Sequence, residues 1–399
     1  MTTQARRRIA TYLALAMIPL SGFATDIYIP SLPQMGLDLH VTSLQVQMTL
    51  SIFLISYGVS QLFIGAILDS FGRYKLGLLS LILFAMASVA IAVTHSIHLI
   101  YVMRAVQGLT VATIVVAKRA YFVDVYQGDE LKSYLSIFTI IWSAGPIIAP
   151  FIGGYLQAGF GWNFNFYFLA GMALLLALLE LLFSAETLAH KADFNIRKIM
   201  STYYQMIATP SFTLGLVMLG FAYSMVMVYN LTGPFIVQSH FGFSPVIAGY
   251  CSLILGFAWM LGGFIGKATI KKPFFRKIAL NLFLQLFLVI AMIGCVAFFE
   301  NIYSLVFFAF VIHASAGYTF NNYFTANLSQ FPENAGIAGG LVGGVTFMIV
   351  SFLSYAIVSV IPAKDGTNLS FSYLLLTGMS FIALYGIYKI SRKILLPVN

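Results

Sequence analysis

The stretch GAILDSFGRYK, residues 65–75, places an acid, two basic residues and two glycines between two long apolar runs. Apolar runs of about 18–25 residues cross the roughly 30 Å hydrocarbon layer of a bilayer as helices. Polar breaks of this kind separate twelve such runs along the chain, near residues 9–29, 46–67, 76–94, 99–120, 134–156, 164–183, 211–233, 246–266, 277–298, 303–326, 336–360 and 370–390. We therefore interpret residues 65–75 as the turn between the second and third membrane spans.

The composition indicates a membrane protein. Of 399 residues, 60% are hydrophobic and 8% are charged, and the mean hydropathy is +0.93. The apolar runs are continuous and do not alternate with polar residues, which disfavours a β-barrel whose strands need only about ten residues. The run 9–29 contains Asp26 and is longer than the apolar part of a typical signal peptide, so we interpret it as the first span. The predicted fold class is an all-α membrane protein with twelve transmembrane helices.

The positions of the charges predict the topology. The chain carries 21 Lys and Arg residues and a net charge of +9. With the N-terminus inside, all of these basic residues except Arg104 and Lys364 fall in or beside cytoplasmic loops, as the positive-inside rule requires. We expect a multi-pass protein of the bacterial inner (cytoplasmic) membrane with both termini cytoplasmic. Because the positive charge is explained by topology, no nucleic-acid partner is expected, and nothing in the sequence demands an oligomer, so we expect a monomer.

The longest polar interruption, residues 184–210, divides the chain into a six-span bundle at 1–183 and a second at 211–399. An offset of 201 residues maps Ser43 onto Ser244 and Gly65 onto Gly266, which favours two related, pseudo-symmetric halves. Within the linker, apolar residues at helical spacing predict a short amphipathic helix on the inner membrane surface, with an irregular tether as the alternative: Ile196, Ile199, Met200, Tyr203 and Ile207.

Four motifs in order resemble those of the major facilitator superfamily. In residues 65–75 the matching positions are Gly65, Asp69, Gly72 and Arg73. YVMRAVQG, residues 101–108, is similar to the arginine motif of the fourth span through Arg104, Gln107 and Gly108. SAGPIIAPFIGGYL, residues 143–156, is similar to the motif of drug and proton antiporters through Gly145, Pro146, Gly153 and Gly154. ATDIYIPSLPQM, residues 24–35, resembles the Bcr/CflA drug-resistance branch.

The resemblance implies roles for two of these motifs. It places Asp69 in a cytoplasmic charge cluster that latches the two halves in the outward-open state and acts through the start of the eleventh span. Family members commonly have basic residues where this chain has Ser70 and Tyr74, so the resemblance implies a weaker latch here. It assigns the bend of the fifth span at Gly145 and Pro146 to sealing the transport pathway, although helix packing alone would also explain these residues.

Asp26 and Arg104 are the candidates for coupling to protons. A charged side chain within the bilayer is costly and usually marks a pathway. Both residues are predicted about one turn from the outer ends of their spans, and the resemblance places these spans around a central cavity. An arginine stays protonated while an aspartate titrates. We expect Asp26 to take a proton from the outer side when Arg104 moves away; a fixed ion pair, or a solvated Asp26, is the alternative.

Other polar residues are candidates for a substrate cavity. Hydrogen bonds to a substrate, or equally to a neighbouring helix, are expected from Gln61, Asn230, His313, Asn321 and Asn322. An adaptable cavity wall is expected around the seventh span from Tyr223, Met225, Met227 and Tyr229. Glu180 and Asp124 are interpreted as interfacial acids. Cys251 and Cys295 lie within spans and are interpreted as packing residues, so no metal site and no cofactor is expected.

The sequence contains no phosphate-binding loop, H-E-x-x-H metal helix or G-x-S-x-G nucleophile turn, so we do not expect an enzyme. An ion gradient is the expected energy source, with protons favoured by Asp26 and Arg104 and sodium as an alternative. The predicted function is a proton-coupled antiporter that exports small amphipathic compounds. The alternatives are a transporter of the same fold for a specific metabolite or siderophore, and a non-transporting receptor or scaffold.

Overall fold

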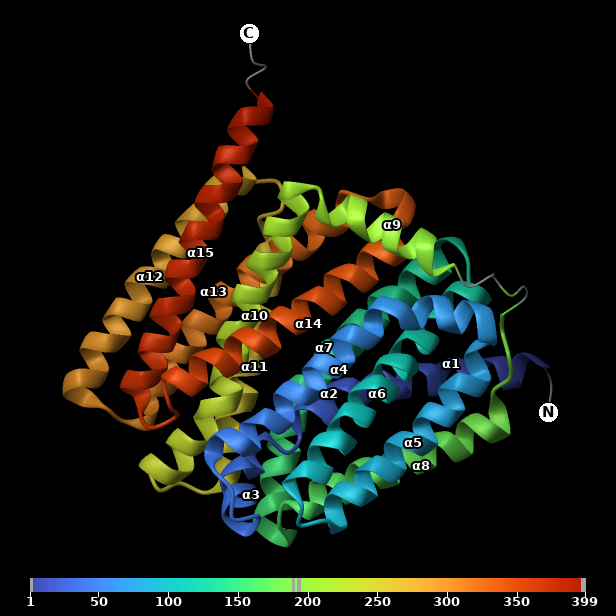
Figure 1. Ribbon diagram of the computed structural model, residues 1–399, viewed down its shortest axis with the longest axis horizontal. Helices are drawn as coiled ribbons and strands as arrows, with labels where there is room; N and C mark the ends of the chain where they lie inside the picture. Colours follow the sequence, from blue (N-terminus) through green and yellow to red (C-terminus); the bar gives the residue numbers. More distant parts are fainter. Residues whose placement is uncertain (1–2, 189–190, 192–194, 396–399) are drawn as a thin grey trace. The chain divides into compact units, whose positions relative to one another are not determined.

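The computed structural model describes residues 3–188, 191 and 195–395, and within these ranges every regular element is a helix (Figure 1). Twelve helical segments are long and apolar enough to cross a membrane. The all-α prediction with twelve spans is therefore confirmed. The contacts between Cα atoms divide the chain into two units, Met1–Asn195 with Pro245–Tyr250, and Ile196–Ser244 with Cys251–Asn399. We call them unit 1 and unit 2.

Unit 1 is a bundle in which α4 packs along α6, α5 packs along both α6 and α8, and α2 packs on α7. Figure 1 shows α5 and α8 side by side. The elements in chain order are α1 (Thr3–Met17), α2 (Leu20–Asp26), the 3-10 helix η1 (Ile29–Ser31), α3 (Leu32–Asp38), α4 (Ser43–Phe71), α5 (Arg73–Val93), α6 (Ile97–Val125), α7 (Gly128–Phe160) and α8 (Asn163–Phe183).

The first span is longer than the sequence predicts and is broken into short helices. It extends to Asp38, well beyond the predicted end at residue 29. Pro19 precedes α2 and Pro30 lies within η1, and each proline removes a backbone N–H from the helical hydrogen-bond ladder. Asp26, the last residue of α2, therefore lies near the middle of the segment Arg6–Asp38 along the chain, and its distance from the outer end of the span stays a prediction.

In unit 2, α10 packs on α13, α14 and α15, and α12 packs on α13 and α15. The glycine-rich run 336–360 is helical throughout, as predicted. The elements from α9 onward are α9 (Ile196–Ile207), α10 (Pro210–Phe235), the π-helix η2 (Ile236–His240), α11 (Pro245–Ala268), α12 (Phe274–Phe299), α13 (Ile302–Ser329), the 3-10 helix η3 (Pro332–Asn334), α14 (Ala335–Val360) and α15 (Gly366–Leu395). The start of α11, Pro245–Tyr250, belongs to unit 1, and the rest of α11 belongs to unit 2.

The helix α9 lies within the predicted linker. Tyr203 and Met206 are buried, and α9 contacts α10 and α14. Met200 and Tyr204 are exposed, one helical turn apart. Because α9 has a second, exposed apolar side, its placement on the inner membrane surface stays a prediction. Residues 189–190 and 192–194 of the linker lie outside the described residues.

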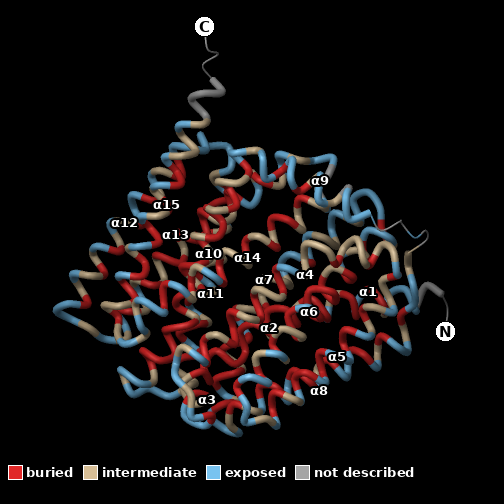
Figure 2. The backbone as a smooth tube through the Cα atoms, viewed as in Figure 1, coloured by how far each residue is buried: buried red, intermediate tan, exposed pale blue. Residues whose placement is uncertain are grey.

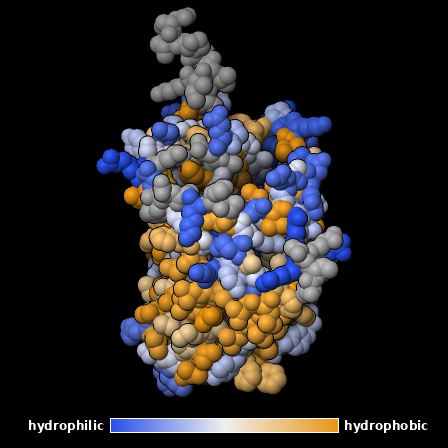
Figure 3. Space-filling view, turned by 90° about the vertical axis from the view of Figure 1, so that its right-hand side faces the viewer, coloured by the Kyte–Doolittle hydropathy of each residue, from blue (hydrophilic) through white to orange (hydrophobic). Residues whose placement is uncertain are grey.

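The outer surface is apolar, as expected for helices that face lipid. Buried residues run through the helices of each unit, whereas the connecting loops are mostly exposed (Figure 2). Figure 3 shows hydrophobic side chains gathered in a broad band beside a hydrophilic region. Large exposed side chains include Met86 on α5 and Leu175 on α8, at 63% and 57% exposure. A broad band of exposed apolar side chains is unfavourable in water. Together with the twelve candidate spans, it identifies an integral multi-pass membrane protein.

Candidate functional site

Asp26 and Arg104 lie together inside unit 1. Asp26 ends α2 and Arg104 lies on α6, and their exposed fractions are 2% and 0%. Their charges are close enough to interact electrostatically. Two distant segments of the sequence thus bring an acid and a base into one buried region, where charges are expensive unless they are compensated.

Hydrogen bonds to two neighbouring helices and to α6 itself hold the guanidinium group of Arg104. Its Nη1 donates to the carbonyl oxygen of Ala24 at 2.9 Å and to Oε1 of Gln107 at 2.8 Å. Its Nε donates to the carbonyl oxygen of Thr49 at 3.3 Å. Hydrogen bonds to an ionised donor are stronger than neutral ones, so these carbonyls offset part of the cost of burying the charge.

Two aromatic rings also lie against Arg104. Its guanidinium carbon is 4.7 Å from the ring centre of Tyr28 and 4.3 Å from that of Phe53. Tyr28 is fixed in turn by a 2.9 Å hydrogen bond between its hydroxyl and that of Thr49. Such cation–π contacts strengthen when water is excluded. The sequence placed Tyr28 inside a family-like motif, but nothing in the pattern showed that its ring covers Arg104.

The other residues of the span 4 motif set the spacing of helices. Gly108 lies where α6 crosses α4, because a Cβ atom there would be 2.5 Å from the carbonyl oxygen of Phe53. Gln107 is fully buried and donates its Nε2 to the hydroxyl of Ser88 on α5 at 2.8 Å. Glycine at 108 therefore permits the close approach of α4 and α6 on which the contacts of Arg104 depend.

Two glycines of the antiporter motif lie at close contacts of α7 with α2 and the residues that flank it. A Cβ atom at Gly145 would be 2.9 Å from the carbonyl oxygen of Pro19, and one at Gly153 would be 1.6 Å from that of Ile27. Pro146 lies inside α7, and its Cδ contacts α2. Gly154 faces another segment of unit 1, where a Cβ atom would be 2.7 Å from the carbonyl oxygen of Pro245. These contacts are the observed packing, and the sealing role stays a prediction.

The motif at residues 65–75 forms a charge cluster within unit 1. Arg73 Nη2 donates to Oδ1 of Asp69 at 2.8 Å, and Nη1 forms an ion pair with Asp124. The sequence pattern indicated an interfacial acid at Asp124 and did not predict its ion pair with Arg73. Gly72 joins α4 to α5 with φ of +102°, a conformation that favours glycine. Among the described residues, no atom of a neighbouring element lies within 4 Å of a Cβ atom built at Gly65.

Glu186, in the segment that follows α8, caps the first turn of α5. Its carboxylate accepts hydrogen bonds from the backbone N–H groups of Arg73 at 3.2 Å and Tyr74 at 3.1 Å, and from those of Thr187 and Leu188. Partial burial alone would raise the pKa of Glu186, but these N–H groups together hold it below its usual value. The start of the linker is therefore tied to the motif at residues 65–75.

A second buried pair of charges was missed from the sequence. Lys118 of α6 forms an ion pair with Glu180 of α8, and their side chains are 9% and 2% exposed. The hydroxyl of Ser184 donates to the other carboxylate oxygen of Glu180 at 2.8 Å. The interpretation of Glu180 as an interfacial acid was wrong, because the bundle closes around it. The signal available in the sequence was one acid and one base near the predicted inner ends of two spans.

The candidates for a substrate cavity in unit 2 fall into two groups. Buried and in contact with protein are Met227, His313 and Asn322. His313 Nε2 is 3.0 Å from the hydroxyl of Tyr373, and Asn322 Nδ2 donates to the carbonyl oxygen of Tyr318 at 2.8 Å. Half-buried are Tyr223, Asn230 and Asn321. Their contact with a substrate stays a prediction.

Tyr223 belongs to a cluster of aromatic rings that the sequence did not reveal. Its ring centre is 5.5 Å from that of Trp259, 5.9 Å from that of Phe320 and 5.8 Å from that of Phe347. The four rings come from α10, α11, α13 and α14. All four are half-buried. Aromatic pairs at these distances attract one another, so the four rings form one packed aromatic cluster in unit 2.

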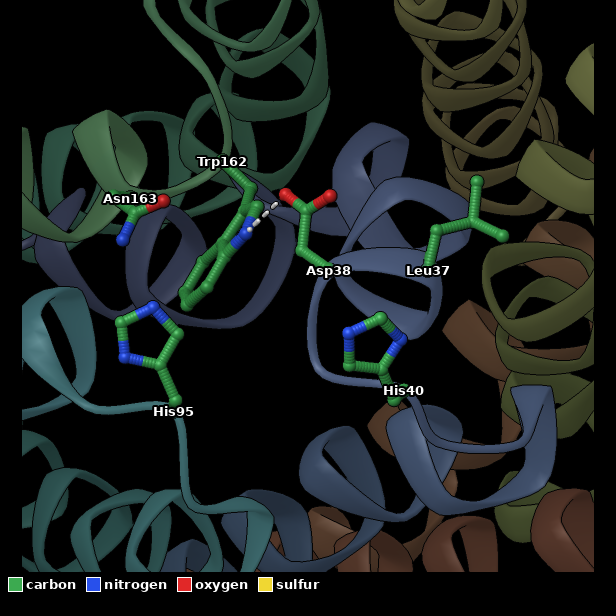
Figure 4. A pocket seen from close by; sticks show the side chains of 6 residues that line it. All are labelled: Leu37, Asp38, His40, His95, Trp162 and Asn163. Carbon is green, nitrogen blue, oxygen red and sulfur yellow. Dashed lines mark hydrogen bonds between the residues drawn. The ribbon is translucent and has the colours of Figure 1, made fainter.

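Each unit also has a cavity that opens broadly to its surface. The cavity of unit 1 has a volume of about 410 Å³ and is lined by Leu37, Asp38, His40, His95, Trp162 and Asn163. Trp162 Nε1 donates to Oδ2 of Asp38 at 3.0 Å. Figure 4 shows this hydrogen bond, with His40 and His95 coming from separate segments. The cavity of unit 2 has a volume of about 530 Å³ and is lined almost entirely by apolar side chains of α10 and α14, among them Phe221 and Phe352. No group of three or more His, Cys, Asp or Glu among the described residues could hold a metal ion.

The fold and the motifs together define a membrane transporter of twelve helices. A model of the Major Facilitator Superfamily matches residues 14–355, and the chain belongs to this family. It is 26% identical to the bicyclomycin resistance protein homolog of Haemophilus influenzae, over 88% of each chain. It is 25% identical to multidrug resistance protein D of Escherichia coli, over 85% of this chain and 86% of that one. These relatives are consistent with the Bcr/CflA-like branch.

The solved structures support the same fold. The xylose transporter XylE from E. coli matches with a TM-score of 0.74 over 96% of this chain and 98% of that chain, at 14% sequence identity. The D-xylose-proton symporter matches with a TM-score of 0.71, also at 14% identity. At this level of identity the likeness shows the fold alone.

Proposed function

We propose that the chain is a proton-coupled antiporter that exports small amphipathic compounds across the bacterial inner membrane by alternating access. The observation that carries the proposal is the burial of Asp26 beside Arg104 inside unit 1. A nearby cation favours an ionised carboxylate, whereas burial away from water favours a protonated one. A change in the separation of the two side chains therefore changes whether Asp26 holds a proton.

Two further observations support the class of cargo. The names of the relatives refer to resistance to drugs and to bicyclomycin. The cavity of unit 2 is open to the surface, and its apolar lining offers contacts for the apolar part of an amphipathic compound. The aromatic cluster around Tyr223 offers a second surface for flat or cationic compounds.

The predicted topology gives the side from which the proton enters. With the N-terminus inside, the end of the first span at Asp38 faces outward, and Asp26 receives its proton from that side. Protonation releases Arg104 from charge attraction, and the return to the inner side discharges the proton. Outward movement of the compound and inward movement of the proton then occupy different steps of one cycle.

The test is proton release in proteoliposomes. The purified protein is reconstituted with a pH-sensitive dye inside, a pH gradient is imposed, and chemically varied drugs are added. We expect drug-dependent proton flux that is lost in Asp26→Asn and kept in Asp129→Asn, which removes an exposed acid at the start of α7. Proton flux that survives in Asp26→Asn would show that another residue carries the proton. Silence of the wild-type protein across the panel would overturn antiport.

A further inference from the structure

We propose that Ser88 is a positioning residue that orients Gln107 and thereby holds the guanidinium group of Arg104 at Gln107, in competition with its charge attraction to Asp26. The proposal deepens the proposed function and rests on it. Ser88 lies on α5, the third span, which packs along α6 but belongs to none of the four motifs. Ser88, Gln107 and Arg104 each have an exposed fraction of 0%.

The three side chains form a directed chain of hydrogen bonds. Arg104 Nη1 donates to Gln107 Oε1 at 2.8 Å, and Gln107 Nε2 donates to Ser88 Oγ at 2.8 Å. Ser88 donates its only hydroxyl proton to the carbonyl oxygen of Phe84 at 2.7 Å. The Ser88 oxygen can therefore only accept from Gln107, and this fixes which end of the Gln107 amide faces each neighbour.

The orientation of the amide decides what Arg104 meets. A guanidinium group carries only donors, so it needs the carbonyl end of Gln107, and a flipped amide would turn an NH2 group toward it. Without the Ser88 hydroxyl, the buried NH2 group of Gln107 loses its acceptor, and the two orientations become closer in energy. The hydrogen bond that holds Arg104 toward Gln107 is then weakened.

The consequence concerns Asp26. Gln107 and Asp26 compete for one guanidinium group, and Arg104 is already fixed on other sides by the carbonyls of Ala24 and Thr49. Weakening the contact with Gln107 makes Arg104 more available to Asp26, which favours the ionised carboxylate. Proton loading then requires more acid, and a lost hydrogen bond of this kind corresponds to a shift of about half to one pH unit.

The first measurement is the dependence of drug-driven proton flux on external pH. We expect Ser88→Ala and Ser88→Cys to move the half-maximal pH toward acid by about half to one unit. Ser88→Thr, which keeps the hydroxyl group, should restore the wild-type profile. Ser354→Ala is the matched control, because Ser354 is equally buried and its hydroxyl donates to the carbonyl oxygen four residues earlier, as that of Ser88 does. An unchanged profile in both Ala and Cys variants would overturn the positioning role while leaving antiport intact.

The second measurement does not depend on transport. Unfolding of Ser88→Ala, Gln107→Leu and the double variant in detergent gives a double-mutant cycle. If Ser88 acts through Gln107, the changes in the free energy of unfolding should not be additive. Ser88→Ala should then have almost no effect in a protein that already carries Gln107→Leu. Additive changes would overturn the inference even if the wild-type protein showed no proton flux, so this failure is distinct from that of the proposed function.

Discussion

The ion pair of Lys118 and Glu180 provides a quantitative test of the bundle in unit 1. Glu180→Gln removes the negative charge while keeping the shape of the side chain, and leaves the ammonium group of Lys118 in a site where its side chain is 9% exposed. The matched double variant, Lys118→Met with Glu180→Gln, removes both charges and keeps similar volumes.

The expected size of the effect follows from burial. Breaking one partner of a buried ion pair costs about 3–5 kcal/mol, because the remaining charge is left uncompensated, whereas replacing both partners is often nearly neutral. We therefore expect Glu180→Gln to lower the free energy of unfolding by about 3–5 kcal/mol and the double variant to change it by about 1 kcal/mol.

The assay is reversible unfolding in mixed micelles with increasing denaturing detergent, followed by circular dichroism. Asp129→Asn is the control, because it breaks the exposed pair with Lys132, in which both side chains are largely in solvent, and no measurable change is expected. The reasoning is refuted if Glu180→Gln costs less than about 1 kcal/mol, or if the double variant costs as much as the single one.

Two more predictions concern contacts of α7 and of the segment after α8. Gly153→Ala should reduce the yield of folded protein sharply, because the added Cβ atom would lie 1.6 Å from the carbonyl oxygen of Ile27. Gly159→Ala should be tolerated, since nothing among the described residues lies within 4 Å of a Cβ atom there. Gel filtration in detergent compares the yields of the two variants. Glu186→Gln should weaken the cap on α5. The pKa of Glu186 is held below its usual value of about 4.5, so the stabilisation that its carboxylate adds is complete above that pH and is lost as the pH falls through the lowered pKa. The thermal unfolding midpoints of the variant and the wild type should therefore converge on acidification. A difference between the midpoints that stays constant with pH would contradict this.

The spans could be predicted because their signal is local. Continuous apolar runs identify helices in lipid without any knowledge of neighbours, and the glycine-rich run at 336–360 followed this rule. The first span departed from it because Pro19 and Pro30 break the helix while the chain continues across the membrane as far as Asp38. In the sequence, Pro30 and the residues after it resembled a loop, so the predicted span ended at residue 29.

The candidate site was predicted only in part. Asp26 and Arg104 stood out as charges in apolar runs, and the structure brings them together. The aromatic partners of Arg104 did not stand out, because Tyr28 and Phe53 are ordinary residues of membrane helices, and only the crossing of helices brings their rings to the guanidinium group. Glu180 was misjudged for the same reason, since its distance along the sequence from a span end does not show which side of α8 the bundle covers.

Taken by itself, the sequence determined the class of environment, the helical nature of the spans and the location of the motifs, because hydropathy and backbone hydrogen bonding act over short stretches of chain. Only the tertiary structure decided which charges are compensated. Compensation depends on atoms within a few ångströms, and these come from helices far apart in sequence, as Lys118 with Glu180 and Arg73 with Asp124 show. Gly108 and Gly153 illustrate both points. Each is visible in the sequence as a glycine, but only the structure shows that another backbone segment packs where its side chain would be.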